Sequence, residues 1–289
     1  MLRAWLELAR VSNLPTAWTN VTAAWLIAGG EMLDVRLAWL WLAGTLFYCA
    51  GMVLNDAADA AFDREHRAER PIPTGRVSAG AAWTAGLGML GAGWAVAVFG
   101  AGACAGVAGG LVVAILAYDL YHKPWSGAIV VMGACRLFLY LTAASVVLGA
   151  GWALWQGEAM VRGLILGAYI VGLTFVARQE ASPRPVGRIA QSLARGFLYA
   201  PALLVAARFM QDGRWEGVVV LPFFVLMVGY AARLMRRGGP AIGEAVGVLL
   251  AGIAIVDALA VAAVSWPLAL GFVACAPLLR LWQRKIAAT

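Results

Sequence analysis

The chain has 289 residues, of which 63% are hydrophobic and only 13% are charged, and its mean hydropathy is +0.81. A soluble domain normally carries about a quarter charged residues, so this composition excludes an ordinary soluble protein. A net charge of +7 is also found in nucleic-acid-binding proteins. Here the basic residues lie mostly in alternate loops between apolar segments, which is typical of membrane topology. We therefore expect a multi-pass membrane protein with membrane lipid, and no nucleic acid, as a partner.

Ten apolar segments follow one another along the chain. They are continuous rather than alternating, so in lipid they indicate helices and not the strands of a barrel. The last segment is short and contains Pro277, so the sequence predicts nine or ten crossings. We expect one all-α domain over residues 1–289, a polytopic transmembrane helical bundle. The segments are residues 14–30, 36–56, 80–100, 102–121, 127–150, 159–180, 188–211, 217–236, 242–263 and 266–282.

The distribution of arginine and lysine predicts the orientation in the cell membrane. If the N-terminus is cytoplasmic, most of the basic residues fall on the cytoplasmic side, as the positive-inside rule requires. The outer side then receives only Arg36, Arg162, Arg208 and Arg214.

An acidic cluster lies at the predicted inner end of the second segment. It consists of Asn55, Asp56, Asp59 and Asp63. On one continuous helix these side chains share an arc of roughly 100°. Carboxylates this close repel one another unless a cation lies among them, and Mg²⁺ takes such oxygen ligands together with substrate phosphates.

A solvated helix end, with its acids paired to nearby arginines, is the alternative. The alanines at 57, 58, 60 and 61 leave the acidic face open, however, and the following loop adds further cations for the same rim. Acids that hold a metal beside arginines that hold phosphate describe a diphosphate site. The loop cations are Arg64, Arg67, Arg70 and Arg76.

The pattern N-D-x-x-D-x-x-x-D, followed by R-P-x-P-x-G at Arg70–Gly75, resembles the UbiA superfamily of intramembrane prenyltransferases. The stretch from Tyr118 to Lys123 is similar to the tyrosine-to-lysine motif of that family, and Arg10–Pro15 is similar to its N-terminal entry. Segment number and order agree over essentially the whole chain. Within the superfamily, the nearest resemblance is to the EboC-like branch.

The resemblance implies about nine helices around a central cavity, with inner loops above it. Mg²⁺ held by two acidic motifs would bind an isoprenyl diphosphate, and the prenyl tail would lie in an apolar tunnel. Ionisation of the allylic C–O bond would give a carbocation for an aromatic or other lipophilic acceptor to attack.

The second acidic motif of the family, D-x-x-x-D, is altered in this chain. One acid, Glu180, remains, and Arg184 stands four residues later. Glu180 can complete a single Mg²⁺ site, and Arg184 can neutralise the diphosphate in place of a second metal. Alternatively, Glu180 only pairs with Arg178 or Arg184. An impaired second site would mean altered metal stoichiometry, slow turnover or binding without transfer.

Arg136 lies inside the fifth apolar segment. An arginine facing lipid is costly, so it should face the cavity. There it would bind the diphosphate or an acidic group on the acceptor, or it would be the structural partner of an acid in the cluster. Asn20 can be a ligand or can join helices. Lys123 can pair with Asp119 four residues earlier, and Asp257 has no evident partner.

These considerations yield three sets of candidate residues. For catalysis we expect Asp56, Asp59, Asp63, Tyr118, Lys123 and Glu180. For Mg²⁺ we expect Asn55, Asp59, Asp63 and Glu180. For substrate binding we expect Arg10, Asn55, Arg64, Arg70, Lys123, Arg136, Arg178 and Arg184.

The leading hypothesis is a Mg²⁺-dependent prenyltransferase whose active-site rim is cytoplasmic. The alternative is a non-catalytic membrane protein that binds or carries isoprenoids or prenyl diphosphates. A transporter is least favoured, because its acids would be expected at mid-membrane rather than at one rim.

Overall fold

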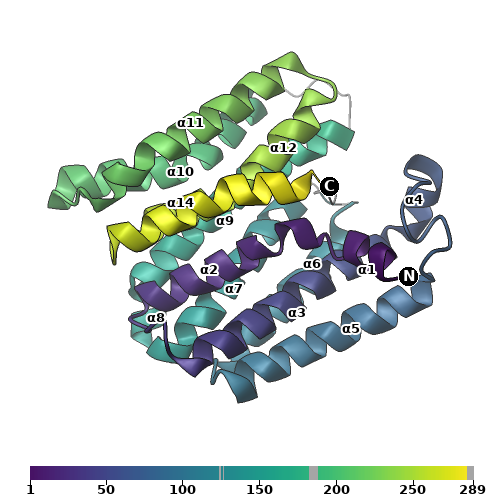
Figure 1. The fold of residues 1–289 in the computed structure, drawn as a ribbon, viewed down its shortest axis with the longest axis horizontal. Coiled ribbons are helices and arrows are strands. Elements are labelled where there is room, and N and C mark those ends of the chain that lie inside the picture. The colour runs from purple at the N-terminus through teal and green to yellow at the C-terminus, as the bar shows by residue number, and fades with distance from the viewer. Residues whose placement is uncertain (124, 126, 182–187, 285–289) are drawn as a thin grey trace.

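The computed structural model describes the whole chain except residues 124, 126, 182–187 and 285–289, and it describes no side chains from 179 to 191. The described chain is helical, without strands (Figure 1). In order, the helices are α1 (Leu2–Leu8), η1 (Val11–Asn13), α2 (Pro15–Ile27), α3 (Val35–Ala58), α4 (Ala60–His66), α5 (Ala79–Ala95), η2 (Val96–Gly100), α6 (Ala105–Tyr121), α7 (Ala128–Leu148), α8 (Trp152–Gln156), α9 (Glu158–Ala181), α10 (Arg188–Asp212), α11 (Glu216–Arg237), α12 (Ala241–Ala251), α13 (Ile253–Val261) and α14 (Trp266–Gln283).

The predicted all-helical membrane fold is confirmed. Seven helical stretches of the described chain are long and apolar enough to span a bilayer, and α6 is a shorter apolar helix. The number of crossings, nine or ten, stays a prediction. The seven stretches are Val35–Ala58, Ala79–Gly100, Ala128–Leu148, Glu158–Arg178, Ser192–Asp212, Glu216–Arg237 and Ala241–Val261.

Helix α2 lies inside the bundle and packs against α3, α7 and α13. Its buried residues include polar ones, among them Thr16, Thr19 and Asn20. Every residue of α13 is buried as well. The core therefore contains polar side chains that need partners within the protein, because lipid offers none.

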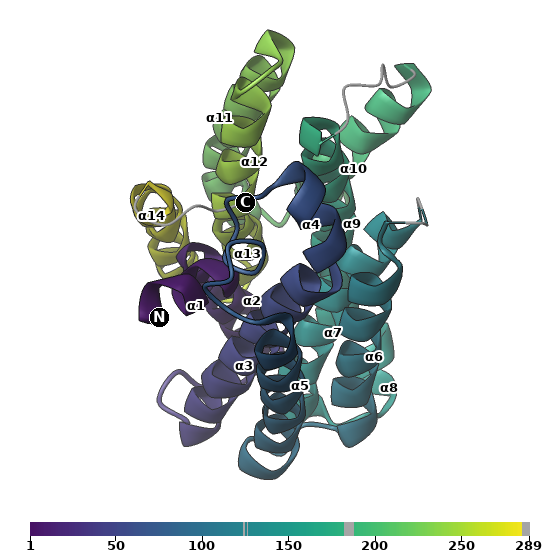
Figure 2. The same cartoon turned by 90° about the vertical axis from the view of Figure 1, so that its right-hand side faces the viewer.

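The N-terminal half forms a group of neighbouring helices. Figures 1 and 2 both show α3 beside α5, and α3 also packs against α6, which packs against α7. The short helices α1 and α4 lie at the same end of the bundle (Figure 1). Both short helices pack against α3, at the end that carries the acidic cluster.

Helices α7 and α9 touch through glycine. A Cβ atom added at Gly133 would lie 2.7 Å from the carbonyl oxygen of Gly167, and one added at Gly167 would lie 3.1 Å from that of Gly133. Small residues at such crossings let the backbones approach, which is how helices pack in lipid. This contact fixes α7, the helix that carries Arg136.

We predict that Gly133→Ala lowers the stability of the protein by about 1–3 kcal/mol, because the added methyl group forces two backbones apart. The matched control is Gly88→Ala in α5, where an added Cβ meets nothing within 4 Å. The control should be neutral or stabilising, since alanine favours helix over glycine. Thermal denaturation of both variants in detergent measures the difference. Equal midpoints would contradict the close packing.

Candidate functional site

The acidic cluster does not lie on one continuous helix. Helix α3 ends at Ala58, a turn follows at Asp59, and α4 begins at Ala60. The prediction of a single column of oxygens along one helix is therefore wrong. The acids fall into two groups by their partners: Asp56 before the turn and Asp63 after it share Arg70, whereas Asp59 in the turn pairs with Lys123.

Arg70 joins the first two acids. Its Nη1 lies 3.1 Å from Oδ1 of Asp56 and 2.9 Å from Oδ2 of Asp63, and both carboxylates are buried. Arg10 adds a second cation, with Nη2 at 2.8 Å from Oδ1 of Asp56. Two buried negative charges are thus neutralised by two arginines from distant parts of the sequence.

The backbone at Arg10 supports this arrangement. Arg10 has a left-handed conformation, with φ of 42°, and its carbonyl oxygen accepts a hydrogen bond from the Tyr48 hydroxyl at 3.1 Å. A non-glycine residue seldom adopts this conformation without outside support. The contact to α3 supplies that support and holds the guanidinium at the rim.

Asp59 has its own partners. Lys123 Nζ lies 2.7 Å from Oδ1, and His122 Nε2 lies 3.4 Å from Oδ2. Burial raises the pKa of Asp59, but hydrogen bonds from His122 and Lys123 outweigh burial, so the pKa lies below its usual value. The carboxylate is therefore ionised at neutral pH. The alternative partner of Lys123, Asp119, is wrong, because α6 ends at Tyr121 and Lys123 turns toward α3 and α4.

Asp119 is a site residue that the sequence analysis missed. It is buried, and its Oδ1 accepts a hydrogen bond of 3.3 Å from Nδ2 of Asn55. Its Oδ2 has no hydrogen-bond partner among the described residues. An acid within the apolar run Ala105–Tyr121 was the available signal, since a carboxylate in a membrane helix needs a partner or a function.

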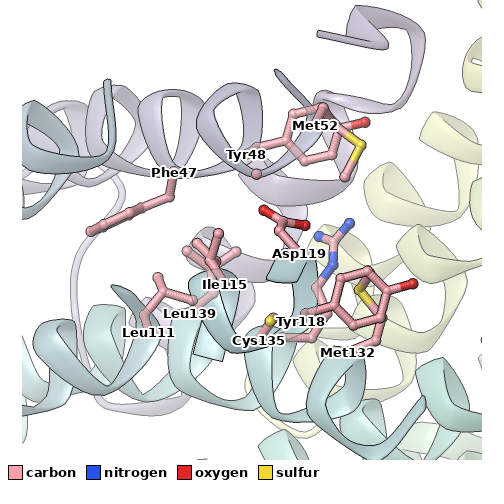
Figure 3. A pocket seen from close by; sticks show the side chains of 12 residues that line it. Phe47, Tyr48, Met52, Leu111, Ile115, Tyr118, Asp119, Met132, Cys135 and Leu139 are labelled. Atoms are coloured by element: carbon pink, nitrogen blue, oxygen red, sulfur yellow. The ribbon is translucent and has the colours of Figure 1, made fainter. Parts of the chain in front are cut away.

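A cavity opens beside this cluster, between α3, α6 and α7. Figure 3 shows a polar end, where Asp119 and Tyr118 lie with Tyr48, and an apolar end around Phe47 and Leu111. Tyr118, one of the residues expected for catalysis, lines this cavity. The lining residues are Phe47, Tyr48, Gly51, Met52, Leu111, Ile115, Tyr118, Asp119, Met132, Cys135, Arg136 and Leu139.

The cavity and the ionic rim are continuous. Met52 lines the cavity, and its sulfur atom lies 3.6 Å from Nη1 of Arg10. Asp119 lines the cavity as well and bonds to Asn55. A ligand with a charged head and an apolar body would therefore meet matching surfaces at the two ends.

Arg136 faces the cavity as predicted, but its partners are not acids of the cluster. Its Nη1 donates to Oδ1 of Asn20 at 2.7 Å, and its Nη2 donates to the Thr16 hydroxyl at 3.1 Å. The alternative that Arg136 is a structural partner of a cluster acid is therefore wrong. The position of Arg136 on α7 is too deep in the bundle for that contact, and α2 offers closer acceptors.

The remaining residues expected to bind substrate or metal lie in different environments. Arg178 donates to the carbonyl oxygen of His122 at 2.8 Å, which links α9 to the loop carrying Lys123. Arg64 is exposed, and in the described chain no ion pair engages it. Glu180 lies in the last turn of α9, but its side chain and Arg184 lie outside the described residues.

The fold and this site define a class of protein. The chain is a multi-pass helical membrane protein with an ion-rich rim above an apolar cavity. The UbiA prenyltransferase family model matches residues 14–241. The chain belongs to the UbiA prenyltransferase family, so the predicted family and the predicted transferase class are confirmed.

Known relatives agree with this assignment. The chain is 28% identical over 253 residues to the digeranylgeranylglyceryl phosphate synthase of Methanopyrus kandleri, a match covering 81% of this chain and 87% of the relative. It is 37% identical over 78 residues to the 4-hydroxybenzoate octaprenyltransferase of Cupriavidus necator, which covers 26% of each protein.

Solved structures share the fold. The apo structure of a UbiA homologue from Aeropyrum pernix K1 matches with a TM-score of 0.65 and 17% identity, covering 86% of this chain and 96% of the homologue. A structure from work on digeranylgeranylglyceryl phosphate synthase matches with a TM-score of 0.63 and 18% identity, covering 91% of this chain and 98% of that one.

We predict that Arg70→Gln destabilises the protein by about 3 kcal/mol, because it removes the arginine that pairs with buried Asp63. Arg64→Gln is the control, since Arg64 is exposed and lies nearby on α4. Thermal denaturation in detergent at neutral pH would show a lower midpoint for the first variant only. A similar fall in both variants would mean that the loss of local positive charge, rather than the loss of the buried pair, is responsible.

Proposed function

We propose that the protein transfers a prenyl group from an isoprenyl diphosphate to a lipophilic acceptor inside the membrane, with Mg²⁺ as cofactor. One observation carries the proposal. Cations and carboxylates converge at the polar mouth of an otherwise apolar cavity. A diphosphate head fits the mouth, and an isoprenyl tail fits the cavity.

The rim would bind the diphosphate through its cations. Arg10, Arg70 and Lys123 already lie within 3.1 Å of the cluster carboxylates. Guanidinium and ammonium groups form strong charge-assisted bonds with phosphate oxygens. On binding, each cation would exchange part of its carboxylate contact for a phosphate contact, and the released carboxylates would become available to a metal.

The donor set fits Mg²⁺. Oδ1 of Asp63 and Oδ2 of Asp119 are buried oxygen atoms without hydrogen-bond partners in the described chain. Among the residues that the structure describes, no three acidic, histidine or cysteine side chains are grouped closely enough to hold a metal ion by themselves. Mg²⁺ does not require such a cage, because it commonly takes one or two carboxylates together with substrate phosphates.

The proposed Mg²⁺ ligands are therefore Asn55, Asp59 and Asp63, with Asp119 as an addition, and Glu180 stays a candidate from the other half. Bound Mg²⁺ would supply positive charge that stabilises the departing diphosphate. Arg10, Arg70 and Lys123 would hold the diphosphate in place and share its developing charge.

The cavity would protect the reactive allylic group. Its walls are apolar side chains such as Phe47 and Leu111, which exclude water that would otherwise react with a carbocation. The rings of Tyr48 and Tyr118 lie at the polar end, where their faces can stabilise a cation. The acceptor would attack from within the cavity while the C–O bond breaks toward the rim.

The location of the charges argues against transport. The acids of the cluster lie at the junction of α3 and α4 rather than midway along a span.

We also propose that this rim faces the cytoplasm, which the distribution of basic loops supports. The relatives' names suggest acceptors of two kinds, a glyceryl phosphate lipid and a hydroxybenzoate.

We predict that Asp59→Asn lowers kcat/KM for diphosphate release at least about 100-fold, because it removes a charge that the site uses to orient Lys123 and the metal. The assay uses the full chain in nanodiscs with labelled geranylgeranyl diphosphate, Mg²⁺ and a panel of acceptors. Asp212→Asn, at an exposed acid near the end of α10, should retain activity. Tight binding without any diphosphate release, from folded protein, would instead support the carrier hypothesis.

Mg²⁺ dependence has its own test. Chelation with EDTA should abolish diphosphate release, and added Mg²⁺ should restore it. Asp119→Asn should raise the Mg²⁺ concentration required for half-maximal release about tenfold, since it replaces a carboxyl oxygen beside Asn55 with an amide nitrogen. Mg²⁺-induced thermal stabilisation in the presence of a thio-diphosphate analogue measures the same affinity without turnover. An unchanged requirement would remove Asp119 from the metal site.

A further inference from the structure

A chain of polar side chains crosses the apolar core from α7 through α2 to α13. Arg136 donates to Oδ1 of Asn20 at 2.7 Å, and Nδ2 of Asn20 donates to Oδ2 of Asp257 at 2.7 Å. Thr16 accepts a second bond from Arg136 at 3.1 Å. Asn20, Thr16 and Asp257 are each at most 1% exposed.

The network determines which way the Asn20 amide faces. Arg136 can only donate, so the amide oxygen must face it, and the amide nitrogen is then left to donate to Oδ2 of Asp257. Reversing the amide would place its NH₂ group against the donors of Arg136. Asp257 therefore fixes Asn20, and Asn20 in turn fixes the guanidinium.

The guanidinium of Arg136, bound by Asn20 and Thr16, lines the cavity. Arg136 belongs to the wall formed by α7, and its Cζ lies 5.9 Å from the centre of the Tyr48 ring. Two of its donors serve α2, and within the described residues no further partner engages its remaining N–H groups. Burying an arginine in a membrane interior costs free energy, so N–H groups of Arg136 that have no protein partner beside a cavity indicate a ligand.

The position of Arg136 separates it from the diphosphate rim. Tyr48, at its level, precedes Asn55 by seven residues on α3, which corresponds to roughly 10 Å along the helix axis. The diphosphate already has Arg10, Arg70 and Lys123 at the rim. The Tyr48 side chain extends from this level to the rim, where its hydroxyl bonds to the carbonyl oxygen of Arg10 at 3.1 Å, so its ring stands between Arg136 and Arg10. Arg136 therefore suits a different anionic group from the diphosphate.

We propose that Arg136, positioned by Asn20 and Asp257, binds an anionic oxygen group of the acceptor, either a carboxylate or a phosphate. This inference rests on the proposed prenyl transfer. The acceptor would lie with its anionic group against Arg136 and its nucleophilic group toward the rim. A compact acceptor with these groups at opposite ends matches the separation. Asp257 is a positioning residue, since it reaches the ligand only through Asn20.

Direct binding tests the proposal without turnover. The probes are 4-hydroxybenzoate and glycerol 1-phosphate, each paired with a neutral counterpart, 4-hydroxybenzamide or glycerol. Binding is measured by thermal shift and by equilibrium dialysis with the full chain in nanodiscs. The wild-type chain should bind one anionic probe at least about tenfold more tightly than its counterpart, because charge-assisted bonds are lost in the neutral molecule. The better of the two anionic probes identifies the group as carboxylate or phosphate.

Three variants then assign the preference to residues. Arg136→Gln should abolish the preference for the anion, and Asp257→Asn should weaken it. Arg162→Gln is the matched control, because Arg162 is also a buried arginine but pairs with Glu158 and lies outside the lining of this cavity. Arg136→Lys should restore part of the preference, since the charge returns without the planar fork.

Turnover separates this role from a structural one. Arg136→Gln and Asp257→Asn should raise the KM for the anionic acceptor about tenfold or more and leave the KM for geranylgeranyl diphosphate within about twofold. An equal rise in both KM values, or the same loss in Arg162→Gln, would overturn the proposal. Failure of the wild-type chain to prefer either anionic probe would also overturn it. Absence of diphosphate release together with Arg136-dependent anion binding would refute the proposed transfer and leave the anion site standing.

Discussion

The pairing of buried carboxylates with arginine and lysine at the C-terminal end of α3 is the interaction on which the site depends. Asp56, Asp59 and Asp63 are all less than 10% exposed. Unpaired charges at that depth would cost several kcal/mol each. Their partners come from the N-terminus, from the loop after α4 and from the loop after α6. Neutralising the acids therefore draws three separate segments over the mouth of the cavity.

The same requirement operates deeper in the bundle. Arg136 and Asp257 do not pair directly, because Asn20 stands between them. The intervening amide accepts one bond from the guanidinium, which keeps other donors for the cavity. In both places, the apolar surroundings dictate that every charge has a partner, and the choice of partner decides which atoms remain for a ligand.

Much of the fold could be predicted from the sequence, because apolar run length alone specifies helices in lipid. The predicted segment 36–56 is α3, and 127–150 is α7. The acidic cluster and its arginines were also identified from residue type and spacing. The turn at Asp59 was not, because the alanines around it favour a continuous helix. No local sequence pattern predicts that Arg70 forms an ion pair with Asp63.

Contacts between residues far apart in the sequence were the other feature that could not be predicted. Asp257 had no evident partner because Asn20 lies 237 residues earlier in the chain. Asp119 was interpreted through its sequence neighbour Lys123, whereas its observed contact is Asn55 on another helix. Spacing rules describe residues on one helix, so contacts between helices escape them. The residues that were misjudged are those whose roles depend on a neighbouring helix.

The bond from Arg178 to the carbonyl oxygen of His122 ties the end of α9 to the residue next to Lys123. The tether connects the two halves of the molecule through a main-chain oxygen. Helix α9 can therefore govern where the Lys123 cation stands in the other half. Sequence changes along α9 would tune the ionic rim by moving its scaffold, without altering any ligand.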